Sequence, residues 1–270
     1  MKNIRIITCA LLCAALLGIG THAYEDIAVR INGMDTEIGA LLVGSTTYVP
    51  FDAANEVLSF GDAQLSGGAG VMHATTPFAT ISARAGDCYI EAEGRYLGGN
   101  VLNISGMLYV PIRSLAKAYN ADVEWDANTR SVDISASVGD AIISGDEFYD
   151  SDEVYWLSRI ISAEAGSEPM EGKILVGDVV LNRVASNEFP NTIYGVIFDR
   201  EWGIQFTPTE NGTIYNPPTT DSIIAAKLCL DSYHISRDVM YFLNPERATN
   251  FWVPANRPYL MTVGCHDFYS

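Results

Sequence analysis

The sequence predicts an α+β protein in two parts, a duplicated small α+β module followed by a mostly α-helical domain. Between residues 24 and 135, short alternating apolar runs broken by Gly, Asn and Asp are typical of strands. Two motifs of this region recur at one offset, which indicates a duplication. From residue 150 the apolar residues recur at steps of three and four, which is typical of helices. The 270 residues, 48% of them hydrophobic, suffice for two buried cores.

The first 23 residues have the form of a secretory signal peptide. Lys2 and Arg5 precede an apolar stretch over residues 6–19, and small residues before Ala23 suit cleavage there. The stretch is shorter than the roughly 20 residues that a membrane span needs. We therefore expect a secreted, monomeric protein that begins at Tyr24 and keeps no transmembrane anchor after cleavage.

The charge of the chain argues against nucleic acid as a partner. The formal net charge is −17, and loss of the signal peptide with its two positive charges would make it −19. Nucleic-acid binding depends on neutralisation of the phosphate charges by Lys and Arg, and in this chain Asp and Glu outnumber Lys and Arg. The acidity indicates a solvated surface, and an acidic cleft suits a neutral glycan better than a polyphosphate.

Three cysteines remain after signal cleavage, namely Cys88, Cys229 and Cys265. An odd number cannot form a complete disulfide framework. Two alternatives stay open here. Cys229 and Cys265 form a bridge in an oxidising compartment, or all three thiols are buried and pack as small apolar groups.

The repeat in the first part has an offset of 61 residues. Tyr48-Val49-Pro50-Phe51 matches Tyr109-Val110-Pro111-Ile112, and Gly33 matches Gly94. Each Tyr-Val-Pro motif precedes a helical pattern, because Pro suits the approach to a first helical turn.

The expected elements of this part are short. The two helical patterns cover residues 52–58 and 113–119, and a hairpin is expected from residues 121–125 and 131–134. This arrangement over residues 27–135 resembles the small α+β module named after the N-terminal domain of copper amine oxidases. The resemblance implies a wall-binding or positioning module, whereas the alternative is a folded spacer.

The name of that module raises the question of a metal. His73 is the one histidine of this part, Cys88 lies far from it in sequence, and no pair has metal-ligand spacing. We predict no metal and no cofactor. Residues 136–150 are rich in small and acidic residues without a sustained period, which is typical of a linker between domains.

Glu164 is the candidate catalytic acid. Asp150 and Glu153 have the spacing of a capping box, so a helix is expected to begin there. Glu164 falls on the apolar stripe of that helix, four residues after Ile160. Removal from water disfavours the charged carboxylate and raises its pKa, as a general acid requires. The apolar stripe consists of Val154, Leu157, Ile160 and Ile161.

A lone Glu near the end of an amphipathic helix is also typical of a boundary or a salt bridge, so the surrounding sequence decides. Several blocks follow one another in order between residues 152 and 270. The blocks are Ala163-Glu164-Ala165-Gly166-Ser167-Glu168-Pro169, Glu171-Gly172-Lys173-Ile174, Val179-Val180-Leu181-Asn182-Arg183-Val184, Gln205-Phe206-Thr207, Asn211-Gly212-Thr213-Ile214-Tyr215, Tyr241-Phe242-Leu243-Asn244-Pro245 and Gly264-Cys265-His266-Asp267-Phe268-Tyr269. In this order they resemble the SleB-type cell wall hydrolases, the spore-cortex-lytic family.

The resemblance implies a lysozyme-like domain with lytic transglycosylase activity on the glycan strands of peptidoglycan. One carboxylic acid, Glu164, would protonate the glycosidic oxygen between N-acetylmuramic acid and N-acetylglucosamine. The muramoyl 6-hydroxyl would then attack the anomeric carbon. The implied setting is turnover of the cell wall or of the spore cortex during germination. The alternatives are a wall-binding protein without catalysis and an N-acetylmuramoyl-L-alanine amidase.

The resemblance also implies polar and aromatic residues around a glycan groove, because sugars need amide and hydroxyl hydrogen bonds and flat apolar faces. These residues are Gln205, Tyr241, Asn244, His266 and Tyr269. Each also has a structural interpretation, as a turn or a packed terminus.

The sequence departs from the family pattern at two places. Gly166-Ser167 stands where the family commonly has Arg-Gly, and Asp178 stands where it has a small apolar residue. By helical spacing, Asp178 either faces water at the edge of an apolar stripe or supplies a second carboxylate for hydrolysis.

Overall fold

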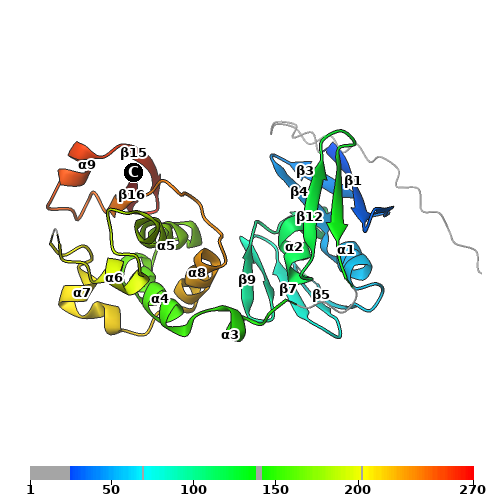
Figure 1. Ribbon diagram of the computed structural model, residues 1–270, viewed down its shortest axis with the longest axis horizontal. Coiled ribbons are helices and arrows are strands. Elements are labelled where there is room, and N and C mark those ends of the chain that lie inside the picture. The colour runs from blue at the N-terminus through cyan, green and yellow to red at the C-terminus, as the bar shows by residue number, and fades with distance from the viewer. Residues whose placement is uncertain (1–24, 69, 138–141, 202) are drawn as a thin grey trace, which may run out of the picture.

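The computed structural model describes residues 25–68, 70–137, 142–201 and 203–270. The predicted signal peptide, with Cys9 and Cys13, lies outside these ranges. The described chain forms an N-terminal domain of strands and a C-terminal domain of helices, which stand side by side and are joined through α3 (Gly145–Phe148) (Figure 1). The mixed α and β content predicted from the sequence is therefore confirmed.

The N-terminal domain contains two sheets and two short helices. The larger, eight-stranded sheet has the order β10-β11-β4-β3-β1-β13-β12, with β2 paired to β1. Its strands are β1 (Glu25–Ile31), β2 (Met34–Asp35), β3 (Ala40–Val43), β4 (Thr46–Pro50), β10 (Leu102–Ile104), β11 (Met107–Pro111), β12 (Asp122–Asp126) and β13 (Ser131–Ser135). The second sheet is a five-stranded meander of β5 (Gln64–Gly68), β6 (Val71–Thr75), β7 (Thr80–Arg84), β8 (Tyr89–Ala92) and β9 (Arg95–Gly98).

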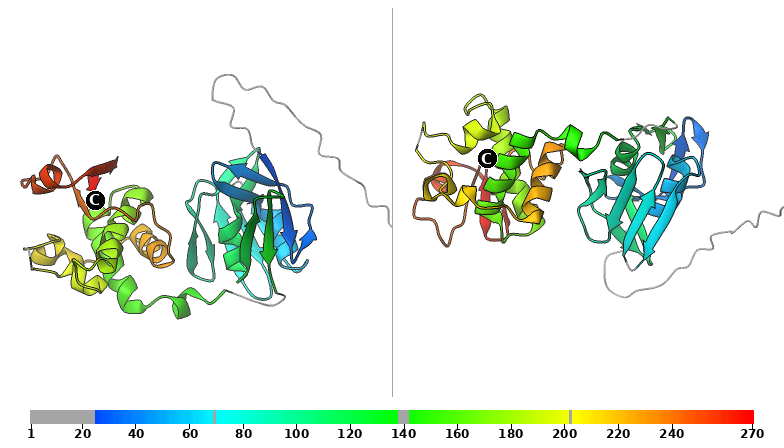
Figure 2. Two further views of the ribbon diagram at one scale, coloured as in Figure 1. Left: turned by 45° about the horizontal axis from the view of Figure 1, so that its top comes forward. Right: turned by 90° about the horizontal axis from the view of Figure 1, so that it is seen from below.

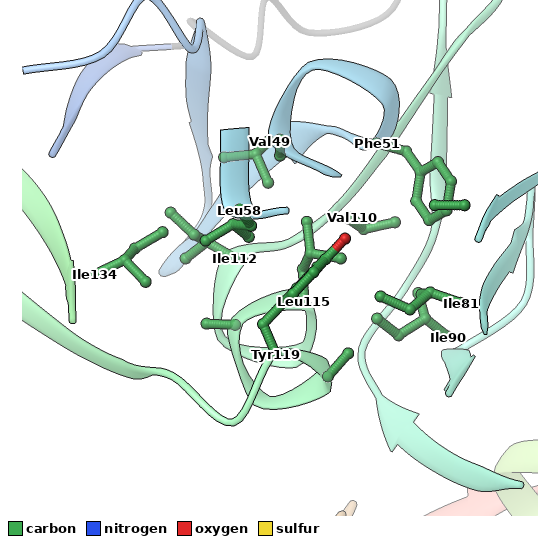
Figure 3. Packing of buried hydrophobic residues seen from close by; sticks show 14 of the residues in the cluster. Val49, Phe51, Leu58, Ile81, Ile90, Val110, Ile112, Leu115, Tyr119 and Ile134 are labelled. Atoms are coloured by element: carbon green, nitrogen blue, oxygen red, sulfur yellow. The ribbon is translucent and has the colours of Figure 1, made fainter. Parts of the chain in front are cut away.

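The two Tyr-Val-Pro motifs end strands and begin helices, as their sequence predicts. Pro50 and Pro111 are the N-cap residues of α1 (Phe51–Leu58) and α2 (Ile112–Ala118), so each helix begins one residue before the expected position. Phe51 and Leu115 pack together with apolar residues from both sheets in one buried core (Figure 3). Burial of these side chains is the main stabilising contribution in this domain.

The motifs also contact each other. β4 and β11 pair antiparallel around Val49 and Val110, which stand opposite one another. Tyr48 is paired with Pro111, and Pro50 with Tyr109, so each motif meets the other in a symmetric register. The predicted hairpin is confirmed by the antiparallel pairing of β12 with β13.

Of the segment predicted as a linker, residues 138–141 lie outside the described ranges, and the described part has structure of its own. Ile142 is 6% exposed and belongs to the core of the N-terminal domain. The backbone N–H of Gly145 donates to the carbonyl of Glu93 at 2.7 Å, which ties the beginning of α3 to the N-terminal domain. The end of this segment, with α3, is thus attached to the N-terminal domain.

The C-terminal domain is mostly helical and ends in a small sheet (Figure 2). Its helices are α4 (Ser151–Ala165), α5 (Met170–Ala185), α6 (Ile193–Ile197), α7 (Pro208–Asn211), η1 (Thr213–Tyr215), α8 (Thr220–Leu230) and α9 (Trp252–Asn256). The sheet has the order β14-β16-β15, from β14 (Tyr241–Leu243), β15 (Tyr259–Val263) and β16 (His266–Tyr269). This sheet was not predicted from the sequence.

Helix α4 begins where the sequence predicts. The Asp150 side chain accepts hydrogen bonds from the backbone N–H groups of Asp152 and Glu153, which satisfies two donors of the first turn. Leu157, Ile160 and Ile161 are fully buried, as expected for the apolar stripe.

Helix α5 lies at the centre of the domain. α4, α6, α8 and β14 all pack against it. Residues on every side of the helix are therefore buried, from Leu175 and Val176 through Val180. Such a helix has no solvent face along its middle turns.

The two domains meet at a buried ion cluster. The carboxylate of Asp231, 1% exposed, accepts hydrogen bonds from Nε and Nη2 of Arg95 at 2.8 and 3.0 Å and from Nζ of Lys117. Arg95 and Lys117 belong to the N-terminal domain, and Asp231 follows α8. We call these three residues the Asp231 clamp. Lys227 of α8 adds a hydrogen bond from its Nζ to the carbonyl of Gly94 at 3.2 Å.

The cysteines of the described chain are free. Cys229 is buried on α8, Cys88 is half-buried at the domain interface, and Cys265 is exposed in the turn between β15 and β16. This excludes the Cys229–Cys265 bridge in this structure, and Cys265 is not the buried thiol of the other alternative. In the described ranges, no helix is long and apolar enough to cross a membrane.

Candidate active site

Glu164 lies in the last turn of α4, and it lines a cavity of about 540 Å³. α7 and η1 pack against α4 and form the opposite wall. The lining residues are Arg159, Ser162, Ala163, Glu164, Thr207, Pro208, Asn211, Thr213, Asn216 and Pro217. Apart from Glu164 and Arg159, the described lining residues are uncharged.

The environment of Glu164 favours its protonated form. Burial raises the pKa of Glu164 from 4.5 to about 7. Burial disfavours a charge that has too little solvent or hydrogen bonding to stabilise it. A carboxylic acid with this pKa holds its proton near neutral pH and can donate it to a leaving group.

Arg159 supplies the positive charge of the cavity. Its guanidinium carbon lies 3.7 Å from the centre of the Tyr155 ring, in a cation–π contact. Its Nε is buried and has no hydrogen-bond partner in the described chain. A buried donor without a partner is costly, so this group is available to an acceptor on a ligand.

Aromatic side chains stand beside the cavity. Tyr215 at the end of η1 is 59% exposed, and it follows the lining residue Thr213 by two positions. Its ring meets Trp156 of α4 edge to face, with ring centres 6.4 Å apart. Exposed aromatic faces next to hydroxyl and amide groups suit the pyranose rings of a glycan.

The five residues predicted to bind the glycan are absent from the described lining of this cavity. Gln205 accepts a hydrogen bond from Nη1 of Arg183 at 3.4 Å, and the Tyr241 hydroxyl accepts one from Nη2 of Arg257 at 2.9 Å. Asn244 caps the turn after β14, because its side chain accepts from the backbone N–H of Glu246. These contacts give all three a structural role.

His266 and Tyr269 lie in β16 and are 6% and 5% exposed. Burial lowers the pKa of His266, so the imidazole is neutral near pH 7. Its Nδ1 is buried without a partner in the described chain, and its ring packs edge to face on Phe242. Glycan binding by these five residues stays a prediction.

Asp178 does not face water, which corrects the simpler of its two interpretations. Its side chain is 0% exposed, because α5 is covered on all sides at this turn. The carboxylate lies 2.8 Å from Nδ1 of His234 and accepts from the backbone N–H groups of Ile235 and Ser236 at 2.8 and 3.0 Å. Asp178 thus fastens the segment after α8 to α5, and it is not among the residues lining the cavity at Glu164.

Glu168 has a similar fastening role. It precedes Pro169, the N-cap of α5, and accepts a hydrogen bond from the backbone N–H of Cys265 at 2.9 Å. Gly264, with φ +58°, allows this approach, since a Cβ there would lie 1.8 Å from a Glu168 carboxylate oxygen.

Most of the cavity wall was not predicted from the sequence. Arg159 and Ser162 stand on the same helix as Glu164, and Asn211 and Thr213 belong to a block that resembles the family. Arg159 and Ser162 precede Glu164 by five and two residues, and these spacings do not place side chains on one helix face. The contact of the second pair with α4 is a matter of tertiary packing, which spacing does not reveal.

Both parts of the chain are similar to known proteins. A family model described as Cell Wall Hydrolase matches residues 167–269, beginning three positions after Glu164. The C-terminal part of this chain carries a cell wall hydrolase domain. A second family model, Copper amine oxidase N-terminal domain, matches residues 28–134.

The similar curated proteins are spore cortex-lytic enzymes. Those of Bacillus subtilis strain 168 and of Bacillus cereus are each 32% identical over 120 residues, which is 44% of this chain. The matched parts cover 38% and 45% of those two proteins, so the chain spans less than half of their length.

Two solved structures are also similar to the cell wall hydrolase domain. One is the catalytic domain of the germination-specific lytic transglycosylase SleB from Bacillus anthracis, with 31% identity, 45% of this chain and 97% of that chain covered, and a TM-score of 0.41. The other is the catalytic domain of the Bacillus cereus SleB protein, with 31% identity, 45% and 92% coverage, and a TM-score of 0.41.

Proposed function

We propose that this protein is an exported lytic transglycosylase that cuts peptidoglycan between N-acetylmuramic acid and N-acetylglucosamine, with Glu164 as the catalytic acid. The observation that carries the proposal is a single carboxylic acid with a pKa of about 7, facing a cavity in a cell wall hydrolase domain. The named activity of similar proteins supports the same reaction.

The reaction needs two proton transfers, one from the Glu164 carboxyl group and one back to it. Glu164 donates its proton to the glycosidic oxygen while the bond from that oxygen to the anomeric carbon breaks. The 6-hydroxyl of the muramoyl residue then attacks the anomeric carbon and gives its proton to the Glu164 carboxylate. The product is a 1,6-anhydro sugar, no water is consumed, and the acid is regenerated.

The charge of the cavity favours this reaction over hydrolysis by paired acids. Most glycoside hydrolases hold a second carboxylate about 5–9.5 Å from the first, where it attacks the sugar or activates water. Among the described lining residues, Glu164 is the only acid. The carboxylate of Asp178, the other candidate, is buried and forms three hydrogen bonds with residues 234–236.

The expected products identify the reaction. Digestion of purified peptidoglycan, followed by mass spectrometry, should yield fragments that end in 1,6-anhydromuramic acid. Fragments with reducing ends alone would show hydrolysis, and released peptide stems would show amidase action. Binding without release would show a wall-binding protein that lacks catalysis.

The role of Glu164 is tested by Glu164→Gln. Loss of general acid catalysis should lower the rate by about 10²–10⁴-fold without loss of the fold. Glu210→Gln is the matched control, because Glu210 lies on α7 next to the cavity but is exposed and does not line it. Retention of activity in Glu164→Gln would assign the acid elsewhere.

The setting of the reaction belongs to the same proposal. The names of the similar proteins support a substrate in the spore cortex or cell wall, and the N-terminal pattern of the sequence supports export. For the N-terminal domain we propose an origin by duplication, supported by the 61-residue offset and by the symmetric register of β4 and β11.

A further inference from the structure

A second groove, of about 650 Å³, lies in the N-terminal domain and shares no described lining residue with the cavity at Glu164. It is bounded by the turn between β3 and β4, by the start of α2, and by the paired strands β12 and β13. Trp125 of β12 lies in its wall and is 41% exposed. We call it the Trp125 groove.

The alternation of β12 separates its apolar from its acidic side chains. Val123 and Trp125 both line the groove, and Val132, which is paired with Trp125, lies there too. Asp122, Glu124 and Asp126 occupy the alternate positions of the strand, whose side chains project from the opposite face. The indole is thus presented to the groove without the neighbouring acids.

The charge of the groove is opposite to that of the protein. In a chain of net charge −17, the described lining of this groove contains no acid and one charged residue, Arg113. The Arg113 side chain is exposed and donates one hydrogen bond, from Nη1 to the carbonyl of Val123 at 3.4 Å. Its other donors are free to bind a carboxylate on a ligand.

Hydroxyl, amide and backbone groups complete the lining. Thr46, Thr47 and Asn100 supply side-chain donors and acceptors, and Gly98 and Gly99 add backbone atoms to the wall. Gly99 has φ +140°, and a Cβ there would lie 2.5 Å from Pro111, so a glycine is required at this point of the wall.

The groove reaches the other domain through one aromatic ring. Tyr233 of the C-terminal domain lines it and packs against Gly98, where a Cβ would come within 2.1 Å of the ring. The second aromatic wall of the groove therefore exists only when the two domains are joined.

We propose that the Trp125 groove is a second glycan-binding site, which takes pyranose rings of an N-acetylated glycan strand on Trp125 and a carboxylate of the muramoyl residues or their peptides on Arg113. A flat exposed indole, hydroxyl and amide groups, and a single cation without acids match a sugar polymer that bears carboxylates. The choice of polymer rests on the proposed function. α7, which borders the cavity, lies on the side of its domain away from the N-terminal domain, so the two sites are apart (Figure 1).

The test counts binding sites on the full chain. The Glu164→Gln protein is titrated with a soluble peptidoglycan tetrasaccharide in a calorimeter. Two fragments should bind per chain. Addition of Trp125→Ala should remove one of the two sites or weaken it about tenfold, because central aromatic residues carry much of the binding energy of such contacts. Trp125→Phe should retain part of the affinity, which separates loss of the ring from loss of the fold.

Matched controls define the outcome that overturns the proposal. Phe78→Ala removes an aromatic side chain of similar exposure, 47%, from the β6–β7 turn outside the groove, and both sites should persist. Arg113→Gln should weaken binding of the muramoyl tetrasaccharide but not of chitotetraose, which has no carboxylate. Equal stoichiometry and affinity in Trp125→Ala and Phe78→Ala would exclude the site. If the wild-type chain released no glycan fragments while Trp125→Ala still lost a site, only the proposed reaction would fail.

Discussion

One carboxyl group determines the pH range in which the proposed reaction can run. The pKa of Glu164 is raised to about 7 by burial alone, without a neighbouring negative charge. Arg159 lines the same cavity but stacks on Tyr155, and it leaves the raised pKa in place. The acid is thus protonated in the free enzyme up to about neutral pH.

The rate should accordingly fall as the pH rises. The acid must carry its proton when the substrate binds, so kcat/KM is expected to be level below about pH 7 and to decrease about tenfold per pH unit above it. The measurement is release of soluble fragments from peptidoglycan at low substrate concentration between pH 5 and 9. A profile that rises through pH 7 would mean that Glu164 acts first as a base.

The sequence predicted the burial and the raised pKa of Glu164 but not its surroundings. The four-residue step from Ile160 was enough to place the carboxyl on the apolar side of α4, because that helix has one buried face. For Asp178 the spacing also indicated the apolar stripe, and the interpretation as an acid facing water was wrong, since α5 is covered on all sides. Spacing along one helix cannot show what packs against the other face.

At the scale of elements, Asp178 is a connection between two segments. Its three hydrogen bonds hold residues 234–236, the segment between α8 and β14, against α5. Asp178→Ala should lower the free energy of unfolding by about 3–5 kcal/mol, because buried backbone donors lose their acceptor and a space remains. Urea denaturation measures this change. Asp178→Asn, which keeps the shape and one acceptor, should fall between alanine and the wild type.

Replacement of an acid by alanine at the surface provides the comparison. Glu188 is exposed after α5, so Glu188→Ala should change the free energy of unfolding by less than about 0.5 kcal/mol. Similar losses in Asp178→Ala and Glu188→Ala would show that the buried connection contributes little.

Elements with a local signal were predictable. Pro50 and Pro111 locate the starts of α1 and α2 to within one residue, and Asp150 locates the start of α4. The sheet of β14, β15 and β16 was not, since its strands have three to five residues and acquire their register from each other. Pairing between short segments that are distant in the chain leaves little periodicity to detect.

At the scale of the whole molecule, the Asp231 clamp joins the two domains. Arg95 and Asp231 are 136 positions apart, and nothing in the sequence links them. The Arg95 side chain is 7% exposed, so removal of Asp231 would leave a buried charge without a partner. Asp231→Ala is expected to cost about 3–5 kcal/mol, most of it at the interface.

The separation of the domains is the measurement. Calorimetric unfolding should give one transition for the wild type and two for Asp231→Ala, and limited proteolysis should cut faster between residues 136 and 150. Asp238→Ala is the control, because Asp238 is exposed in the segment that follows the clamp. A single transition in Asp231→Ala would mean that the remaining contacts, such as Lys227 with Gly94, hold the domains together.

The clamp also fixes a distance. Arg95 and Lys117 of the N-terminal domain both bind the carboxylate of Asp231. The Trp125 groove and the cavity at Glu164 are therefore held in one fixed arrangement, unlike two binding sites joined by a flexible linker. With a flexible linker, the catalytic domain could cut any bond that the linker allows it to reach. Its effective concentration at a bond would decrease as the linker becomes longer. A fixed arrangement of the domains instead keeps the distance between the two sites constant. In a mesh of parallel strands, bonds would be cut at a constant offset from the strand on which the protein rests.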